Sequence, residues 1–321
     1  MGFKGFLGNE RLLENLRQAL KTGRTSHFYV ISGPKGSGKH TLARLLSAAL
    51  LCQEPNKPCL TCRHCRKVLS GAHPDVILVD DPEKKTVPVE LMRQMRSDLF
   101  VRPNEAARKI YILPRGQDMG LPGNSPAQNA LLKVLEEPPS YGVFLLLTEN
   151  PERLLPTVRS RCAELSLRPL EEKLLLQQLQ SRFPQASSQQ LRAAAARSGG
   201  YLGQAMELVE KGQDLSQTTL SFADAFGKKD VYGLLQTLVP MEKWKRDQLI
   251  LELNRWVELL TQALESRCGI PGSGETAVLL GKSRSSRDLM AAVKCLKTAI
   301  DYVQGNVSVA AICGALAWDL R

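Results

Sequence analysis

The sequence contains no long hydrophobic run. No apolar stretch approaches the roughly 18 to 20 residues that a membrane-spanning helix needs, and the first residues, Met-Gly-Phe-Lys-Gly, have no apolar signal core. Internal repeats and a low-complexity tail are also absent. We therefore expect a cytoplasmic protein with no membrane partner. Its 321 residues, 43% of them hydrophobic, are enough for two or three packed domains.

Acidic residues are outnumbered by basic ones. There are 32 Asp and Glu against 43 Lys and Arg, which gives a net charge of +11. This excess is typical of proteins with an anionic partner, most often nucleic acid. Arginine-rich solvated helices produce the same balance, so charge alone leaves DNA binding as one of two interpretations.

Cysteines are sparse outside one short segment. Of the eight, four lie close together, at Cys52, Cys59, Cys62 and Cys65. Zn²⁺ takes four thiolates in a tetrahedron, and two-residue gaps let the backbone fold around one ion. The spacing predicts a structural zinc site in an insert at residues 52–65. Reduced thiols or a redox pair are the alternative, and His64 and His73 are near enough to serve as substitute ligands.

A glycine-rich segment separates a strand pattern from a helix pattern. Phe28–Ser32 is β-branched and aromatic, and from Thr41 onward apolar residues recur at helical spacing. Between them, Gly33-x4-Gly38-Lys39 fits the Walker A loop, whose backbone N–H groups hold phosphates while the lysine reaches the terminal ones. The candidate nucleotide-binding residues are Gly33, Gly36, Gly38, Lys39 and Thr41.

The loop lacks the hydroxyl that normally binds Mg²⁺. His40 stands where Ser or Thr is expected, and Thr41 is rotated about 100° around the helix from that position. ATP or ADP is therefore a candidate ligand, but we expect hydrolysis to be impaired. The alternative is an architectural loop that is empty or holds phosphate or sulfate.

Short apolar runs alternate with helical patterns in the first half of the chain. The strand-length runs are Phe28–Ser32, Val76–Asp80, Lys109–Leu113, Val143–Leu147 and Ala163–Leu167. This alternation predicts an α/β fold with a parallel five-stranded sheet covered on both faces and the glycine loop at the carboxyl end of its first strand.

After Pro169 the strand patterns stop and helical ones follow. Three short helices are expected between residues 171 and 209, and longer ones in the rest of the chain. We expect Gly269–Ser285 to be a loop. Trp244, Trp256 and Trp318 lie in apolar helical patterns, which predicts that they are buried in a helical core.

Several segments together resemble the bacterial replicative clamp-loader subunits, the AAA+ group that contains the DNA polymerase III gamma/tau ATPase and its delta prime relative. They occur in the family order. The segments are Thr25–Phe28 with the Walker loop, the cysteine insert, His73-Pro74-Asp75, Val89–Met95, Asn129–Pro139 and Ser160-Arg161-Cys162. The resemblance implies an AAA+ module at 1–168 that contains the zinc insert, a three-helix lid at 169–212 and a helical collar at 213–321.

The same resemblance implies partners. Such a subunit works in a hetero-pentamer with gamma/tau-like ATPases and a delta-like subunit, and the assembly places a sliding clamp on primed DNA. Basic residues of the AAA+ layer would face the DNA phosphates. The chain would then be a subunit of the DNA polymerase III holoenzyme, with no polymerase activity of its own.

Three departures from the ATPase pattern point to the delta prime type. An active subunit carries Asp-Glu after the third strand and a phosphate-sensing arginine in the lid, but here Pro114-Arg115 and Gly203-Gln204-Ala205 stand at those places. With His40, these changes predict a largely non-hydrolysing subunit. Thr148 and Asn150 are candidates for a retained polar sensor.

The Ser160-Arg161-Cys162 motif is retained. In the family its arginine is a finger that enters a neighbour's ATP site, so the resemblance gives Arg161 a catalytic role in trans. An ordinary surface arginine is the alternative. For the whole chain, the alternatives are an active gamma/tau-type ATPase and a P-loop nucleotide kinase, although a kinase leaves the cysteine insert unexplained.

Overall fold

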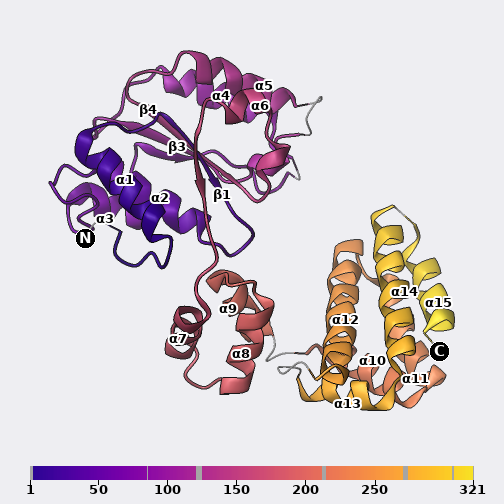
Figure 1. The fold of residues 1–321 in the computed structure, drawn as a ribbon. Coiled ribbons are helices and arrows are strands. Elements are labelled where there is room, and N and C mark those ends of the chain that lie inside the picture. Colours follow the sequence, from indigo (N-terminus) through magenta and orange to yellow (C-terminus); the bar gives the residue numbers. More distant parts are fainter. Residues whose placement is uncertain are drawn as a thin grey trace. The chain divides into compact units, whose positions relative to one another are not determined.

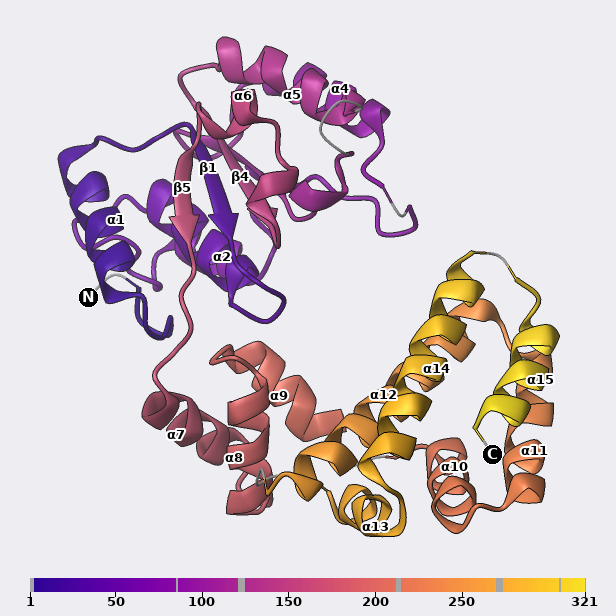
Figure 2. The ribbon, with the colours of Figure 1, turned by 45° about the vertical axis from the view of Figure 1, so that its right-hand side comes forward.

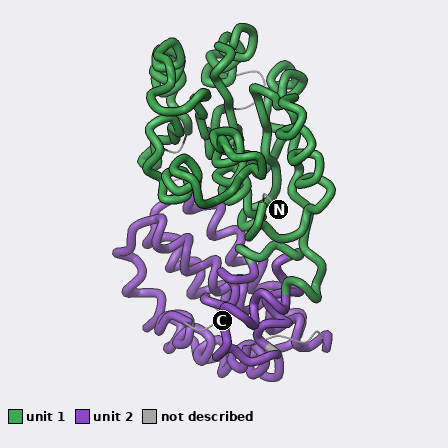
Figure 3. Tube along the Cα trace, turned by 90° about the vertical axis from the view of Figure 1, so that its left-hand side faces the viewer, with its two compact units in different colours: residues 1–175, 199–204 green, residues 176–198, 205–321 purple. Residues whose placement is uncertain are grey.

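The structure, a computed structural model, describes residues 3–84, 86–120, 125–211, 215–269, 274–305 and 307–320. The chain divides into two compact units (Figure 3). The first comprises residues 1–175 and 199–204, and the second comprises residues 176–198 and 205–321. None of the helices in the described ranges is both long and apolar enough to span a bilayer. The division at residues 168 and 212 that the family resemblance implies remains a prediction.

The first unit is built on a parallel sheet. Its strands are β1 (Phe28–Ser32), β2 (Val76–Leu78), β3 (Lys109–Leu113), β4 (Gly142–Thr148) and β5 (Ala163–Ser166). Their order is β2-β3-β4-β1-β5 and every pairing is parallel. Figure 2 shows β5, β1 and β4 side by side. The predicted parallel five-stranded α/β fold is therefore confirmed, with β2 ending two residues before the predicted Asp80.

Helices cover both faces of this sheet (Figure 1). They are α1 (Glu10–Thr22), α2 (Lys39–Leu51), α3 (Arg63–Leu69), α4 (Val89–Leu99), α5 (Pro126–Glu136) and α6 (Pro156–Arg159), with short 3-10 turns η1 (Gly116–Asp118) and η2 (Pro151–Arg153). Alternation along β1 places Tyr29 and Ile31 in one core with residues of α1 and α2. Phe28 and Val30 enter the opposite core with residues of α4 and α5. Because both faces are buried, the strands are continuously apolar.

The second unit contains helices and no strand among its described residues. Its elements are α7 (Glu172–Arg182) and α9 (Leu202–Lys211), both divided between the units, and α8 (Ser188–Arg197), α10 (Gln217–Lys228), α11 (Val231–Leu238), η3 (Val239–Lys243), α12 (Arg246–Arg267), α13 (Glu275–Ser283), α14 (Ser286–Gln304) and α15 (Val309–Asp319). Trp256 is completely buried and stacks on Phe222 with ring centroids 4.0 Å apart. Ser285 caps α14 by accepting the N–H of Asp288.

Two expectations for this unit were wrong. The segment predicted as a loop contains α13, which buries Ala277 and Leu280 against the bundle and so gains packing that its short apolar pattern did not reveal. Trp318 is 64% exposed, because α15 turns Ile312, Leu316 and Leu320 inward and Trp318 lies on the opposite side.

Candidate functional site

The glycine loop lies where the sequence predicts it, between β1 and α2 at the carboxyl edge of the sheet. Gly36 and Gly38 have φ angles of 76° and 94°, a region that favours glycine. The N–H of Gly33 donates to the carbonyl of Thr148 at the end of β4, 3.2 Å away. The loop therefore has its backbone tied to the neighbouring strand.

Lys39 is turned back onto its own loop. Its side chain is almost fully buried, and its Nζ donates to the carbonyl oxygens of Gly33 at 2.6 Å and Pro34 at 2.9 Å. The Glu149 carboxylate lies 3.9 Å from the same nitrogen. Burial lowers the pKa of Lys39, and the charge of Glu149 opposes that shift. A bound phosphate would have to replace the two carbonyls as the acceptor of this ammonium group.

The start of α9 packs directly on the loop. The Gly203 N–H donates to the Gly36 carbonyl at 3.0 Å. A Cβ built on Gly36 would lie 2.3 Å from the backbone nitrogen of Gln204, and one built on Gly203 would lie 2.8 Å from the Gly36 Cα. Only glycines permit this approach. At the position where the family resemblance places a sensing arginine, this chain has a backbone hydrogen bond between Gly203 and Gly36.

A cation follows β3 in place of the expected acidic pair. Arg115 donates from Nε to Asp80 at 2.7 Å, and its Nη1 and Nη2 donate at 2.7 Å to the backbone carbonyls of Lys84 and Asp81. All three guanidinium nitrogens are thus engaged in holding the segment after β2. Asp118, the next acid along the chain, is in η1. Residues 121–124 lie outside the described residues.

His40 is a poor substitute for the missing hydroxyl. Desolvation by the surrounding residues lowers the pKa of the exposed His40, the charges of Lys39 and Arg44 lower it further, and the charge of Asp80 opposes these shifts. At neutral pH the imidazole is therefore uncharged, and Mg²⁺ prefers oxygen ligands to nitrogen. Thr41 is exposed on the first turn of α2.

The candidate polar sensor is engaged locally. Thr148 is fully buried, and its hydroxyl donates to the Asn150 carbonyl at 3.0 Å and accepts the Asn150 N–H at 3.2 Å. The Asn150 side chain accepts the N–H of Glu152 at the start of η2. Both side chains therefore stabilise the turn after β4.

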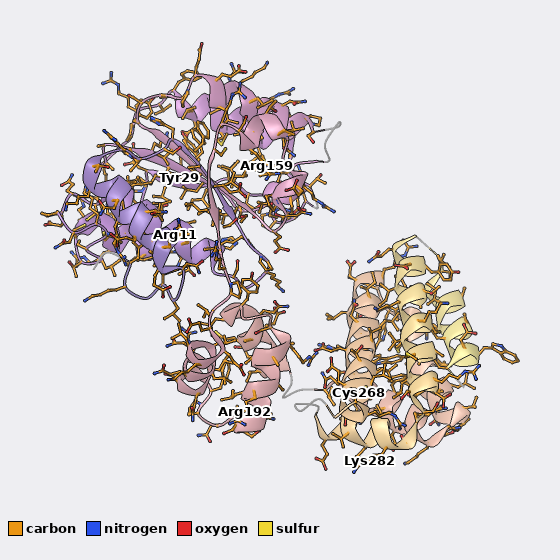
Figure 4. All side chains as sticks on the ribbon, in the orientation of Figure 1. Arg11, Tyr29, Arg159, Arg192, Cys268 and Lys282 are labelled. Carbon is orange, nitrogen blue, oxygen red and sulfur yellow. The ribbon has the colours of Figure 1, made fainter. Side chains whose placement is uncertain are left out.

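Arg161 is exposed between α6 and β5. Its Nη1 donates to the Thr157 carbonyl at 3.0 Å, and no carboxylate of the described ranges pairs with it. Its neighbour Arg159, labelled in Figure 4, differs because it pairs with Glu152 at 2.9 Å and Glu164 at 4.0 Å. Of the two arginines, only Arg159 has an ion pair with a carboxylate among the described residues.

The four predicted cysteines come together. Their Sγ atoms all lie within 4.8 Å of one another. Cys52 ends α2 and Cys62 caps α3, which also carries Cys65. The backbone N–H groups of Cys62 and Thr61 lower the pKa of the Cys59 thiol to about 6, whereas burial raises the pKa values of Cys52 and Cys65. A cluster of four thiols at this spacing fits Zn²⁺, which it would hold as a structural ion.

The two nearby histidines are not part of this cluster. His64 Nδ1 lies 2.9 Å from His73 Nε2, and His73 Nδ1 accepts the N–H of Asp75 at 3.1 Å. Both ring nitrogens of His73 are thus engaged within the protein. Sequence reasoning assigned no role to Asp75, and the His-Pro-Asp motif was the only signal for it.

Known proteins resemble the chain over these elements. A family model described as "DNA polymerase III, delta subunit" matches residues 8–171. The delta' subunit of DNA polymerase III from Escherichia coli is 34% identical over 261 residues, which cover 80% of this chain and 75% of that protein. The delta' subunit from Bacillus subtilis is 35% identical over 166 residues, which cover 51% of this chain and 49% of that protein.

A tau subunit matches as well. The DNA polymerase III tau subunit of Bacillus subtilis is 28% identical over 229 residues, 70% of this chain and 40% of that protein. The match thus spans half or less of the two Bacillus subtilis relatives. Because delta' and tau subunits are both similar to the chain, these resemblances do not separate the two types.

Proposed function

Because the chain belongs to the family described as DNA polymerase III, delta subunit, we propose that it is the delta prime-like subunit of a clamp loader. In this proposal it hydrolyses little ATP itself and supplies an arginine finger to a neighbouring ATPase. Its partners are gamma/tau-like and delta-like subunits in a hetero-pentamer, a sliding clamp and primed DNA.

The observation that carries the proposal is Arg115 at the end of β3. Phosphoryl transfer depends on positioned charge, with a carboxylate acting through Mg²⁺ and another group orienting the attacking water. Here a guanidinium paired with Asp80 stands at that place. His40 at the Mg²⁺ position and Gly203 on the loop remove two further parts of the machinery.

The glycine loop has a limited capacity for nucleotide in this conformation. Lys39 donates to carbonyls of its own loop, and α9 contacts Gly36. ATP or ADP would be held by the backbone of Gly33, Gly36 and Gly38 with the Lys39 ammonium, provided that Lys39 releases Gly33 and Pro34. Bound nucleotide would supply a phosphate anchor that fixes the loop to α2.

The exposure of Arg161 supports its role as a finger. The single described contact of the Arg161 side chain, to the Thr157 carbonyl, can be exchanged for a phosphate oxygen. A planar guanidinium stabilises the charge spread over the oxygens of a transferred phosphoryl group. In other phosphoryl-transfer systems such a finger is worth about three to five orders of magnitude in rate.

One observation favours the alternative of an active gamma/tau-type ATPase. Glu149 follows β4 and lies 3.9 Å from Lys39, so one carboxylate does approach the loop. If this acid oriented a water molecule, Glu149→Gln would abolish ATP hydrolysis by the isolated chain. In our proposal the isolated chain has no such activity to lose.

The experiment that tests the proposal measures ATP turnover in a loader reconstituted with its ATPase subunits, clamp and primed DNA. Arg161→Ala should lower turnover, and Arg161→Lys should restore it only in part because lysine lacks the planar fork. Arg153→Ala is the control, since Arg153 is an exposed arginine on nearby η2. Equal turnover with Arg161→Ala and Arg153→Ala would remove the finger from the proposal.

A further inference from the structure

The helix that carries two of the cysteines also contacts a distant loop. From α3, His64 reaches His73, with ring centroids 5.2 Å apart. From the next turn, Lys67 Nζ lies 2.6 Å from both carboxylate oxygens of Glu105. Arg63 adds a longer pairing to Glu105 at 3.4 Å. Lys67 and Arg63 of α3 therefore contact Glu105, which lies in the loop that joins α4 to β3.

Asp75 connects the pair of histidines to the same loop. His73 and Asp75 are both buried. The Asp75 carboxylate accepts the backbone N–H groups of Asn104 at 2.5 Å, Glu105 at 2.8 Å and Ala106 at 2.9 Å. A carboxylate that accepts several backbone N–H groups makes strong, charge-assisted hydrogen bonds. The path from α3 to residues 104–106 is thus an unbroken series of polar contacts.

The start of the same loop is held independently of α3. Lys109, whose side chain is buried, donates to the carbonyls of Asp98 at 3.0 Å and Val101 at 3.3 Å. The Tyr141 hydroxyl donates to the Leu99 carbonyl at 2.9 Å. These anchors come from β3 and from the residue before β4. The loop therefore has one anchor in the sheet and one that depends on α3.

Besides the cysteines, α3 is held by Val68, which is buried in the core that it shares with α2. It has seven residues, of which Cys65 and Val68 are buried. Isolated helices this short are unstable in water. The residues between Cys52 and Cys62 form no helix or strand. A metal ion bound by the four thiolates is the strongest restraint available to this segment.

We propose that the four-cysteine metal module is a brace for the loop between α4 and β3, in which His64 and Lys67 transmit the order of α3 to residues 104–106. The loop also presents two exposed apolar side chains, Phe100 at 70% and Val101 at 57% exposure. Loading of the metal thereby determines how well the second half of this loop is fixed. This role is independent of ATP hydrolysis.

Amide hydrogen exchange tests the brace. We expect removal of zinc by a chelator to accelerate exchange at residues 104–106 at least about tenfold, which corresponds to about 1.4 kcal/mol. Two regions should keep their exchange rates. One is Val101, whose N–H donates to the Asp98 carbonyl in the part of the loop that Lys109 and Tyr141 hold, and the other is strand β1. Unchanged exchange at 104–106 would overturn the brace, and so would uniform acceleration that includes β1.

Two variants test the same contacts with zinc still bound. His64→Ala and Lys67→Met leave the four thiols intact, and each should accelerate exchange at 104–106 while the protein retains its zinc by metal analysis. Arg66→Ala is the matched control, because Arg66 is an exposed residue of the same helix. If both variants match Arg66→Ala in the exchange of 104–106, the brace is wrong.

Discussion

At the scale of single residues, charged side chains of the first unit hold backbone segments in place. Arg115 holds the segment after β2, and Lys39 holds its own loop. Asp75 organises residues 104–106. Each of these groups makes two or more hydrogen bonds within the protein, so its removal should lower the stability of the first unit.

The substitution Asp75→Asn tests whether one of these charged groups stabilises the fold. Burial alone would raise the pKa of Asp75, but the N–H groups of Asn104, Glu105 and Ala106 hold it below the usual value. The ionised form therefore stabilises the fold above pH of about 4, and that contribution is lost as pH falls through the lowered pKa. We expect Asp75→Asn to lower the free energy of unfolding by about 1 to 3 kcal/mol at pH 7.

Urea unfolding from pH 7 downward measures the effect. The difference in the free energy of unfolding between wild type and Asp75→Asn should disappear as the solution becomes acidic. Glu83→Gln removes an exposed carboxylate and is the control. A difference that is absent at pH 7, or that persists below the lowered pKa, would contradict the role given to Asp75.

At the scale of elements, the features that could be predicted from the sequence are those set by residues close together in the chain. The runs of β1, β3 and β4 were recognisable because strands buried on both faces are continuously apolar. The cysteine spacing predicted that the four thiols come together, because these residues are close in sequence. The loop between β1 and α2 followed from its glycines. Helix α13 was not predicted, because its apolar stretch is short and the helix is stabilised by packing against the bundle.

Contacts between distant segments were beyond prediction. Arg115 with Asp80, and Gly36 with Gly203, join residues that no local spacing relates. The sequence showed that acids and a lid arginine were missing, but what fills those places depends on how the sheet and α9 come together. The same holds for the path from α3 to residues 104–106.

The contact between α9 and the glycine loop gives an element-scale prediction. Gly36 and Gly71 have φ angles of 76° and 74°, but a Cβ on Gly71 meets nothing within 4 Å. Gly71→Ala should therefore cost only the backbone strain, about 1 to 2 kcal/mol. Gly36→Ala should cost about 1 to 3 kcal/mol more, because α9 must move. Denaturant unfolding of the two variants provides the comparison, and equal losses would contradict the contact.

The four-cysteine cluster gives a second prediction at this scale. The purified protein should contain about one zinc per chain, and Co²⁺ in its place should show thiolate charge-transfer absorption. Cys65→Ser should lose the metal and accelerate amide exchange in α3 while β1 keeps its exchange rate, because Cys65 is the fully buried member of the cluster. Protein that is metal-free and equally stable with or without added zinc would contradict a structural zinc site.

At the scale of the whole molecule, each unit has its own hydrophobic core. Trp256→Ala removes the largest fully buried side chain of the second unit and should lower the stability of that unit by about 3 to 5 kcal/mol. Hydrogen exchange of β1 and β4 should stay unchanged. Tyr302→Ala, at a 56% exposed position, is the control. Equal acceleration in both units would show that they unfold together.

The proposed function also belongs to this scale, because a non-hydrolysing subunit with a finger acts only within an assembly. The most direct test is ATP turnover by the isolated chain and by loaders that contain wild type, Lys39→Ala or Arg161→Ala. We predict that the isolated chain is inert, that Lys39→Ala leaves loader turnover unchanged and that Arg161→Ala lowers it. ATP hydrolysis by the isolated chain that Lys39→Ala abolishes would contradict the proposal and identify an active ATPase subunit.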